Sequence, residues 1–364
     1  MKRVFSGMAA ALLAAVLFFP LRTQAISAQS AILMDATTGR VLYEKDADRQ
    51  SLIASTTKIM TALVICEQCN VLDRVRIPKE AVGVEGSSIY LREGEILTVQ
   101  ELLYGLMLHS GNDAAVALAI YCGGTVEGFA QRMNDKAHLL GMDNTHFVNP
   151  NGLDAPGHFS TARDMAVLTA YAMENPIFRQ TVSTKSVKVA ERYLTNHNKL
   201  LWSVEGADGV KTGYTKAAGR ILVSSATRND RRLVAVTINA PDDWNDHKAL
   251  LNEGFAQYEV RQIVWEGQCL GSIEVAGGVG DSVPLIARES YRYALAPQEE
   301  PETLLSGIGF VYAPVEKDQD AGWAYVVLDG KAVGKIPLVY GDTVEQKKVE
   351  TNFWHRIFGG EANG

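Results

Sequence analysis

The stretch IASTTKIM, residues 53–60, places a serine and a lysine three positions apart inside an apolar run. Residues three apart on a helix share one face, so Ser55 and Lys58 are predicted to point the same way. A serine hydroxyl becomes an effective nucleophile when a neighbouring base takes its proton. Apolar surroundings disfavour the charged form of a lysine and lower its pKa, which frees the neutral amine to act as that base. Alone, this short motif is weak evidence for nucleophilic catalysis, because Ser55 would serve equally as a helix N-cap.

Two more short motifs carry groups suited to the same chemistry. Ser110 and Asn112 lie in SGN, and Lys211 begins KTG; each pattern occurs once in the chain, as does S-x-x-K. Lys211 offers a cation for the terminal carboxylate of a peptide substrate. A second lysine near the serine also lowers the pKa of Lys58, because like charges disfavour each other.

In this order, the three motifs resemble the signature of penicillin-binding proteins and class A β-lactamases. The wider sequence resembles the low-molecular-mass penicillin-binding proteins, which are serine-type D-alanyl-D-alanine carboxypeptidases. This resemblance covers about residues 28–258 and includes LLYGLMLHSGNDAAVALA, NPNGLDAPGHFSTARDMAVL and DGVKTGYTKAAG.

The resemblance implies catalytic roles for four residues. Ser55 would be the nucleophile that forms an acyl-enzyme. Lys58 would be its base in acylation and would help to activate the hydrolytic water. Ser110 would relay a proton to the leaving D-alanine amine, and Asn112 would hydrogen-bond the peptide.

The resemblance also implies a set of substrate-binding groups. Lys211 and Thr212 would hold the terminal carboxylate of the substrate. Gly213 would let the substrate backbone lie against its strand. The backbone N–H groups of Ser55 and Tyr214 would form an oxyanion hole, where preorganised donors stabilise the charge that develops in the transition state.

The predicted function is a DD-carboxypeptidase that trims the terminal D-alanine of peptidoglycan stem pentapeptides, with no metal or cofactor. β-Lactam antibiotics would acylate and inhibit it. A DD-endopeptidase or transpeptidase is the main alternative, because the same acyl-enzyme can meet a different acceptor. A β-lactamase is disfavoured, since class A enzymes deacylate through a loop glutamate and residues 144–165 contain none. The intact motifs disfavour an inactive penicillin-binding sensor.

The elements around the motifs predict an α+β catalytic domain. S-x-x-K opens a helix that is apolar almost all round, as is typical of a buried helix. Thr98 and Glu101 form a capping box for the helix that leads to SGN, and Asp113 is predicted to cap the next helix. Strand pairs around Gly39 and Asn229 enclose this helical block, and we expect them to share one antiparallel sheet beside it.

Four segments are predicted along the chain. Residues 1–25 have the charged start, apolar stretch and small-residue cleavage pattern of a signal peptide. Residues 26–260 form the catalytic domain. Residues 261–345 contain short strands with turn signals and form a small all-β domain. Residues 346–364 have an amphipathic pattern.

Export follows from the signal peptide, and we expect the protein at the cell wall or the outer face of the cytoplasmic membrane. The amphipathic tail, residues 347–364, is a candidate for peripheral attachment to the membrane surface. A frayed terminus, or a helix docked on its own domain, is the alternative.

Charge and cysteine content limit the remaining classes. Cleavage after Ala25 lowers Lys and Arg from 35 to 32 against 42 Asp and Glu, a net charge of −10. A nucleic-acid binder would need a basic footprint, which this chain lacks. Cys66 and Cys69 form a C-x-x-C without the second ligand pair of a zinc site. With Cys122 and Cys269 they are too few for a disulfide framework. We expect buried or incidental thiols; a single disulfide is the alternative.

Overall fold

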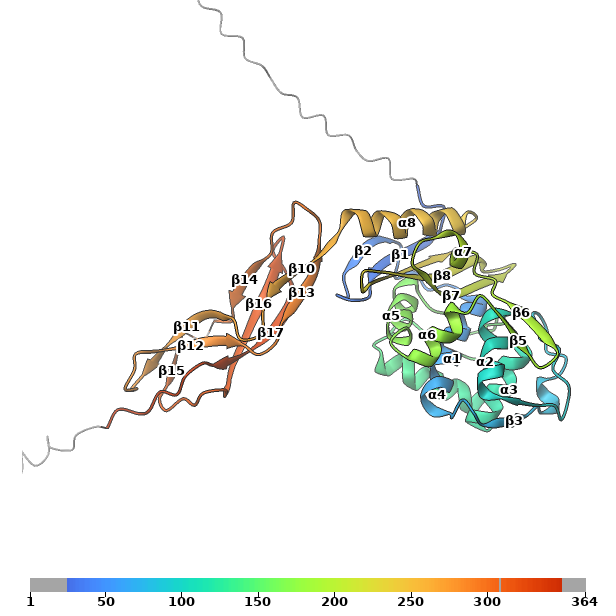
Figure 1. Cartoon of the computed structure of the whole chain (residues 1–364), viewed down its shortest axis with the longest axis horizontal. Helices are drawn as coiled ribbons and strands as arrows, with labels where there is room; N and C mark the ends of the chain where they lie inside the picture. Colours follow the sequence, from blue (N-terminus) through green and yellow to red (C-terminus); the bar gives the residue numbers. More distant parts are fainter. Residues whose placement is uncertain (1–24, 308, 349–364) are drawn as a thin grey trace, which may run out of the picture.

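A computed structural model describes residues 25–307 and 309–348, which form two successive domains (Figure 1). The first ends with helix α8 (Asp243–Gln257), and the second begins with strand β10 (Glu259–Val264). Nearly all of the predicted signal peptide and of the predicted amphipathic tail lies outside the described residues. Across the described ranges, no helix has the length and apolar character needed to span a bilayer.

The first domain is built on a five-stranded antiparallel sheet with the order β2-β1-β9-β8-β7. Its strands are β1 (Ser30–Asp35), β2 (Val41–Lys45), β7 (Ala207–Thr215), β8 (Gly219–Arg228) and β9 (Arg231–Ile238). The N-terminal hairpin joins the later strands through β1 and β9, as the sequence predicts. Strand β7, which contains K-T-G, lies at one edge of this sheet, and among the described residues no strand pairs with its outer side.

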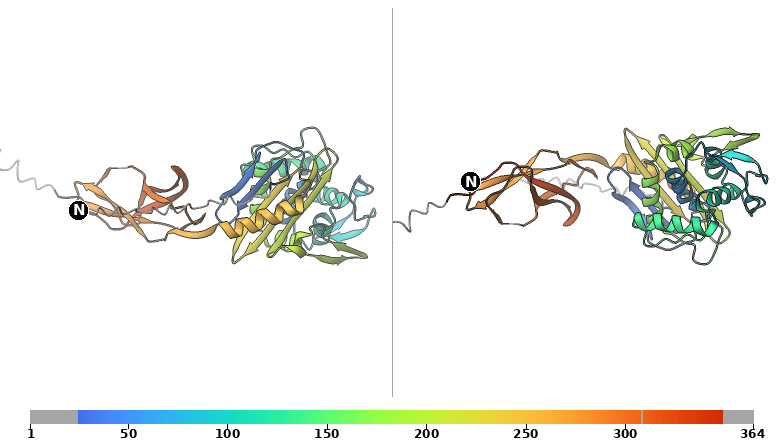
Figure 2. Two further views of the ribbon diagram at one scale, coloured as in Figure 1. Left: turned by 90° about the horizontal axis from the view of Figure 1, so that it is seen from above. Right: turned by 90° about the horizontal axis from the view of Figure 1, so that it is seen from below.

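Helices cover both faces of this sheet (Figure 2). Helix α8 packs on one face against β8, β9 and β1, whereas α5 and α6 pack on the other. The helical block comprises η1 (Ala54–Thr57), α1 (Lys58–Gln68), η2 (Lys79–Ala81), α2 (Val99–Leu108), α3 (Asn112–Gly123), α4 (Val126–Leu139), α5 (Ala162–Ala172), α6 (Pro176–Ser183) and α7 (Leu200–Ser203).

Helix α1 is the central helix of the block and contacts α2, α3, α4, α5 and α6. Every residue from Lys58 to Cys66 is buried, which confirms the buried helix that the apolar pattern predicts. Helix α2 begins with the predicted capping box: Thr98 Oγ1 accepts from Glu101 N at 3.2 Å, and Thr98 N donates to the Glu101 carboxylate at 2.7 Å. Two short two-stranded antiparallel sheets flank the block, β3 (Arg74–Arg76) with β4 (Ile96–Thr98), and β5 (Ser186–Val189) with β6 (Arg192–Thr195).

The second domain is all β, which together with the first confirms the predicted fold class. Its six-stranded sheet has the order β14-β16-β17-β12-β11-β15, and β10 pairs separately with β13. The strands after β10 are β11 (Cys269–Ala276), β12 (Ser282–Ala287), β13 (Tyr291–Leu295), β14 (Glu302–Leu305), β15 (Phe310–Tyr312), β16 (Asp320–Leu328) and β17 (Lys331–Tyr340). Its core is apolar and includes Val283, Ala324, Val326 and Ile336.

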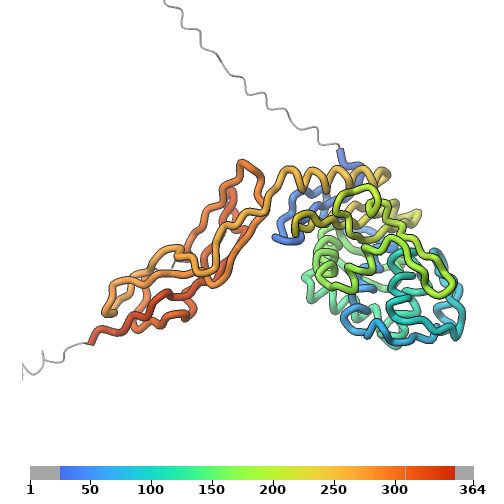
Figure 3. The backbone as a smooth tube through the Cα atoms, in the orientation of Figure 1, coloured from blue at the N-terminus to red at the C-terminus, as the bar shows by residue number. Residues whose placement is uncertain are grey.

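The chain passes directly from α8 into β10, as the backbone trace shows (Figure 3). A second link comes from the turn between β1 and β2. Arg40 pairs with Glu299 at 2.6 Å and donates to Ala294 O at 2.6 Å. Its guanidinium also lies over the rings of Tyr258 and Tyr293. This half-buried cluster fixes the second domain to the edge of the sheet opposite β7.

Candidate active site

The Ser55–Lys58 pair lies where η1 turns into α1. Lys58 Nζ is fully buried; it is hydrogen-bonded to Ser55 Oγ at 2.8 Å and donates to Asn112 Oδ1 at 2.7 Å and to the Asn151 carbonyl at 2.6 Å. A neutral amine has two N–H donors and one lone pair. The carbonyl and amide oxygens can only accept, so both N–H groups serve them and the lone pair is left for the Ser55 hydroxyl. The geometry therefore suits proton transfer from Ser55 to Lys58.

The surroundings of Lys58 favour its neutral form. Burial lowers the pKa of Lys58 well below its usual value, and the nearby charge of Lys211 lowers it further, while Asp113 acts in the opposite direction. Desolvation disfavours an ammonium group because low-dielectric surroundings solvate charge poorly. The apolar surroundings of Lys58 thus favour its neutral amine in addition to packing the core.

The S-x-N motif occupies the break between α2 and α3. Ser110 is buried and adopts a left-handed backbone conformation with φ of 61°, which costs a non-glycine residue energy. Asn112 is oriented by its Nδ2, which donates to Glu85 O at 2.5 Å and leaves Oδ1 toward Lys58. A Cβ at Gly86 would lie 2.7 Å from Asn112 Nδ2, so this close approach requires glycine.

The predicted helix cap at Asp113 is wrong, because Gly111 is the N-cap of α3 and Asp113 is the second residue of the helix. The Asp113 carboxylate accepts from Ala114 N at 2.9 Å, from Ser88 Oγ at 2.6 Å and from the backbone N–H groups of Ile89 and Leu91. These bonds hold residues 88–91 against the start of α3. The loop that orients Asn112 is therefore anchored by the residue next to it.

The K-T-G strand lies against the nucleophile. A Cβ at Gly213 would sit 3.3 Å from both Ile53 O and Ser55 N, so β7 passes close to the backbone of η1 here. Lys211, one strand repeat earlier, is buried; its pKa is lowered to about 7 by desolvation, and its Nζ donates to Thr212 O at 2.8 Å. Tyr214, which follows Gly213, is 66% exposed. The structure thus brings the first and third motifs together at the sheet edge.

The loop before α5 supplies groups that the motif analysis missed. Gly152 has φ of +83°, and a Cβ there would lie 1.8 Å from Ala54 O. This contact presses the loop onto η1 and delivers the Asn151 carbonyl to Lys58. The adjacent Pro150 carbonyl accepts from Thr61 Oγ1 at 2.6 Å. A carbonyl acceptor has no residue-type signature, and only the NPNG stretch indicated a constrained loop.

A buried histidine supports the same loop rather than the chemistry. His158 Nδ1 accepts from Val148 N at 3.1 Å, so Nε2 carries the proton and donates to Thr57 Oγ1 at 2.8 Å. Burial lowers the pKa of His158 to about 4, which keeps the ring neutral. His158 therefore holds the loop against η1 and is not the base next to Ser55; that position is occupied by Lys58.

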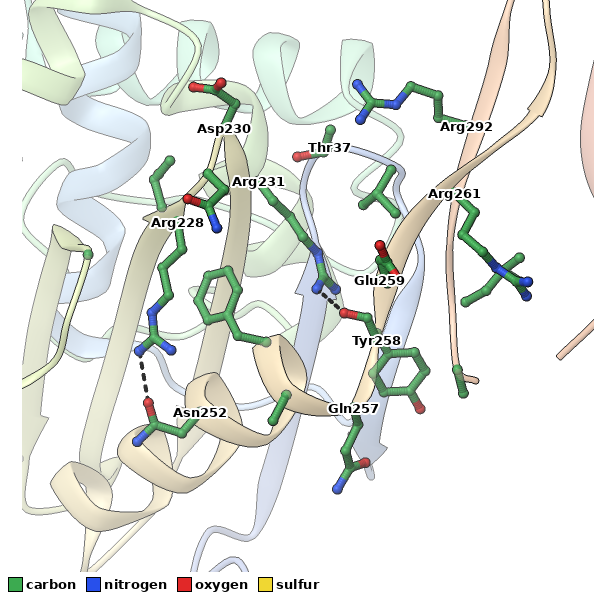
Figure 4. A pocket seen from close by; sticks show the side chains of 18 of the residues that line it. Thr37, Arg228, Asp230, Arg231, Asn252, Gln257, Tyr258, Glu259, Arg261 and Arg292 are labelled. Atoms are coloured by element: carbon green, nitrogen blue, oxygen red, sulfur yellow. Dashed lines mark hydrogen bonds between the residues drawn. The ribbon is translucent and has the colours of Figure 1, made fainter. Parts of the chain in front are cut away.

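A wide pocket elsewhere contains none of the motif residues. It lies at the junction of the two domains, beside the end of α8, and Arg228, Arg231, Arg261 and Arg292 are among its lining residues (Figure 4). Arg231 is already committed to Asp35 at 2.6 Å and to the Tyr258 carbonyl. The motif residues lie elsewhere, beside the edge strand β7.

Comparisons with known proteins agree with this geometry. A family model described as D-alanyl-D-alanine carboxypeptidase matches residues 19–242, and one described as penicillin-binding protein 5, C-terminal domain, matches residues 258–346. The D-alanyl-D-alanine carboxypeptidase DacF of Bacillus subtilis is 34% identical over 327 residues, which cover 85% of this chain and 84% of that protein.

Solved structures give the same result. Penicillin-binding protein 5 of Haemophilus influenzae matches with a TM-score of 0.78 at 31% identity and covers 88% of this chain and 98% of its own. A mutant Streptomyces DD-transpeptidase matches with a TM-score of 0.61 at 37% identity and covers 64% of this chain and 98% of its own. The chain therefore belongs to the D-alanyl-D-alanine carboxypeptidase family of serine hydrolases and carries a C-terminal domain of the penicillin-binding protein 5 type.

Proposed function

We propose that this enzyme is an exported DD-carboxypeptidase that removes the terminal D-alanine from peptidoglycan stem pentapeptides through a Ser55 acyl-enzyme. The observation that carries the proposal is the set of contacts of Lys58 Nζ. Two partners can only accept hydrogen bonds, and the third is the Ser55 hydroxyl. Family membership supports the reaction type.

Acylation begins with proton transfer from Ser55 Oγ to the neutral amine of Lys58. The serine oxygen then attacks the carbonyl carbon of the penultimate D-alanine. Negative charge develops on the carbonyl oxygen, where the N–H groups of Ser55 and Tyr214 stabilise it. Each such donor is worth about 3–4 kcal/mol of barrier. The C–N bond breaks, and Ser110 relays the proton that Lys58 took from Ser55 to the departing D-alanine amine, which returns Lys58 to its neutral form.

Substrate recognition rests on the free side of β7. An extended peptide can add to an exposed sheet edge through backbone hydrogen bonds, and Gly213 leaves room for it. Lys211, in its charged form, and the Thr212 hydroxyl hold the terminal carboxylate. Asn112 hydrogen-bonds the peptide. Water, activated with help from Lys58, then hydrolyses the ester and returns free Ser55.

β-Lactams are proposed to enter the same pathway as inhibitors, because their ring carbonyl acylates Ser55. The loop at 144–165 lacks the glutamate with which class A β-lactamases deacylate, which supports a long-lived adduct. The likeness to a Streptomyces DD-transpeptidase keeps transfer to an amine acceptor as the second candidate activity. Transpeptidation differs from hydrolysis only in the nucleophile that attacks the acyl-enzyme, which is an amine in place of water.

Mass analysis of a synthetic stem pentapeptide ending in D-Ala-D-Ala tests the proposal. We expect loss of one D-alanine with the native enzyme and none with Ser55→Ala. The matched substrate with a C-terminal amide should react poorly, since it lacks the carboxylate for Lys211. Cleavage of cross-linked muropeptide dimers with the pentapeptide left intact would contradict the proposal and favour an endopeptidase. Capture by an added D-amino acid would favour a transpeptidase.

A further inference from the structure

Helices α1 and α3 come together at two places. Lys58 is the first residue of α1 and Asn112 the first residue of α3, and their side chains are hydrogen-bonded at 2.7 Å. Both helices are about equally long, so they also end side by side. Cys69 is the C-cap of α1, and Cys122 is the penultimate residue of α3. At 1.5 Å of rise per residue, this end lies about 15 Å from the catalytic contact.

Two thiols are neighbours at that end. The Cys69 and Cys122 thiols shift the pKa of one another, and Cys122 Sγ contacts the side chain of Gln68, the residue before Cys69, at 3.7 Å. Arg132 of α4 donates to Gln68 Oε1 at 2.7 Å and to Cys122 Sγ at 3.8 Å. All four cysteines are described and carry free thiols, so this is the reduced form.

Contacts between other side chains also hold the C-terminal ends of α1 and α3 together. Tyr121 OH donates to Asp73 Oδ2 at 2.7 Å, which joins the end of α3 to the turn after α1. Lys136 pairs with Glu67 at 2.6 Å, which joins α4 to α1. A bond between the thiols would therefore tighten a junction that other side chains already define.

The remaining cysteines are poorly placed to compete. Cys66 faces the core, and burial raises the pKa of its thiol to about 12. Cys269 lies in the second domain. Cys69 and Cys122 are only half-buried. The pKa of Cys122 is lowered to about 7 by its interaction with the Cys69 thiol and by the charge of Arg132, against desolvation. The thiolate is the reactive form.

We propose that Cys69 and Cys122 form a disulfide bond when the chain meets a disulfide-bearing oxidant. The Cys122 thiolate attacks one sulfur of the oxidant, giving a mixed disulfide and releasing one thiolate. Cys69, deprotonated in turn, attacks Cys122 Sγ and expels the second thiolate. Two protein thiols are oxidised, and one oxidant disulfide is reduced to two thiols.

The bond would close a loop over residues 70–121, which includes η2, α2 and the S-x-N motif. Disulfides stabilise mainly by restricting the unfolded chain, and more so for longer loops. The two cysteines of the C-x-x-C motif would thus not bond to each other, because Cys69 would be bonded to Cys122 of α3. The catalytic groups are untouched, so the inference does not depend on the proposed function.

Thiol mapping of the purified full chain tests this proposal. One sample is incubated with oxidised glutathione and one with dithiothreitol, and both are alkylated and digested. Oxidation should yield one cross-linked peptide that joins Cys69 to Cys122, lighter by two hydrogen atoms than the sum of its reduced parts. The unfolding temperature of the oxidised protein should be higher by about 5–10 °C, reversed by dithiothreitol.

Three variants provide controls. Cys69→Ser and Cys122→Ser should each lose the redox-dependent change in unfolding temperature, whereas Cys269→Ser should keep it. Acylation by a β-lactam should proceed as in the parent protein in all three, which shows that they are folded. A cross-link between Cys66 and Cys69, a dimer through Cys269, or an oxidised protein that unfolds at the reduced temperature would overturn the proposal.

Discussion

The interiors of the two domains are built differently. The catalytic domain buries ionisable and amide side chains, among them Lys58, Asn112, Asp113 and Lys211. In the second domain, the described buried positions are apolar or tyrosine. Burying a lysine is costly, because its ammonium group loses water. Fold stability alone therefore does not account for the lysines, whereas the proposed roles of Lys58 as a neutral base and of Lys211 as a carboxylate receptor do.

This contrast predicts opposite consequences for substitution in the two places. Replacing a buried polar group near Ser55 should remove activity at little cost in stability. Replacing an apolar residue in the second domain should remove stability at little cost in activity. Functional sites commonly show such a trade between activity and stability.

Lys58→Met gives the largest expected effect. Methionine is of similar length and has no basic amine, so acylation of Ser55 by a fluorescent penicillin should slow by about 10³-fold or more. The free energy of unfolding should change little, since the relief of no longer burying an amine is offset by the loss of the donor to Asn112 Oδ1 and the Asn151 carbonyl. Stopped-flow acylation and thermal unfolding measure the two quantities. Acylation within tenfold of the parent rate would refute the role of Lys58.

Gly152→Ala tests the loop that supplies the Asn151 carbonyl. The new Cβ would overlap Ala54 O, so the loop must move off η1. A displacement of about 1 Å at a catalytic contact costs roughly 10²-fold in rate. The matched control is Gly157→Ala in the same loop, which has the same left-handed strain with φ of +81° but nearest atoms at 3.8 Å. Equal losses in both variants would show that strain, and not the Ala54 contact, is responsible.

Lys211 sets the expected pH dependence above neutrality. Its pKa is lowered to about 7, so the free enzyme loses this positive charge as pH rises through that value. The kcat/KM for a substrate with a terminal carboxylate should therefore fall on the alkaline side. Lys211→Arg keeps its charge at every accessible pH, so the fall should disappear even if the maximal rate drops. If kcat/KM of this variant still fell at alkaline pH, the fall would be caused by the titration of a group other than Lys211.

Ile336→Ala gives the smallest effect on activity. Ile336 is fully buried in the second domain, and such a truncation costs about 2–5 kcal/mol of folding free energy. Hydrolysis of a soluble pentapeptide should stay within twofold of the parent value, and unfolding followed by hydrogen exchange should show the loss confined to β10 onward. A large fall in kcat would show that the catalytic domain depends on the second.

Sequence reasoning identified the features that residue type and spacing encode. The S-x-x-K spacing predicted the Ser55–Lys58 contact, the apolar run predicted buried α1, and Thr98 with Glu101 predicted the capping box. The Asn151 carbonyl was beyond reach, because any residue supplies one. The position of β7 at the sheet edge, the anchoring by Asp113 and the meeting of Cys69 with Cys122 depend on long-range packing that no local pattern specifies.

The central claim is that Ser55, activated by Lys58, carries the acyl group. Peptide mapping after incubation with a β-lactam tests it most directly. We predict one adduct per chain, located on the peptide that contains Ser55, absent in Ser55→Ala and formed much more slowly in Lys58→Met. An adduct on any other residue, or labelling that persists in Ser55→Ala, would contradict the account.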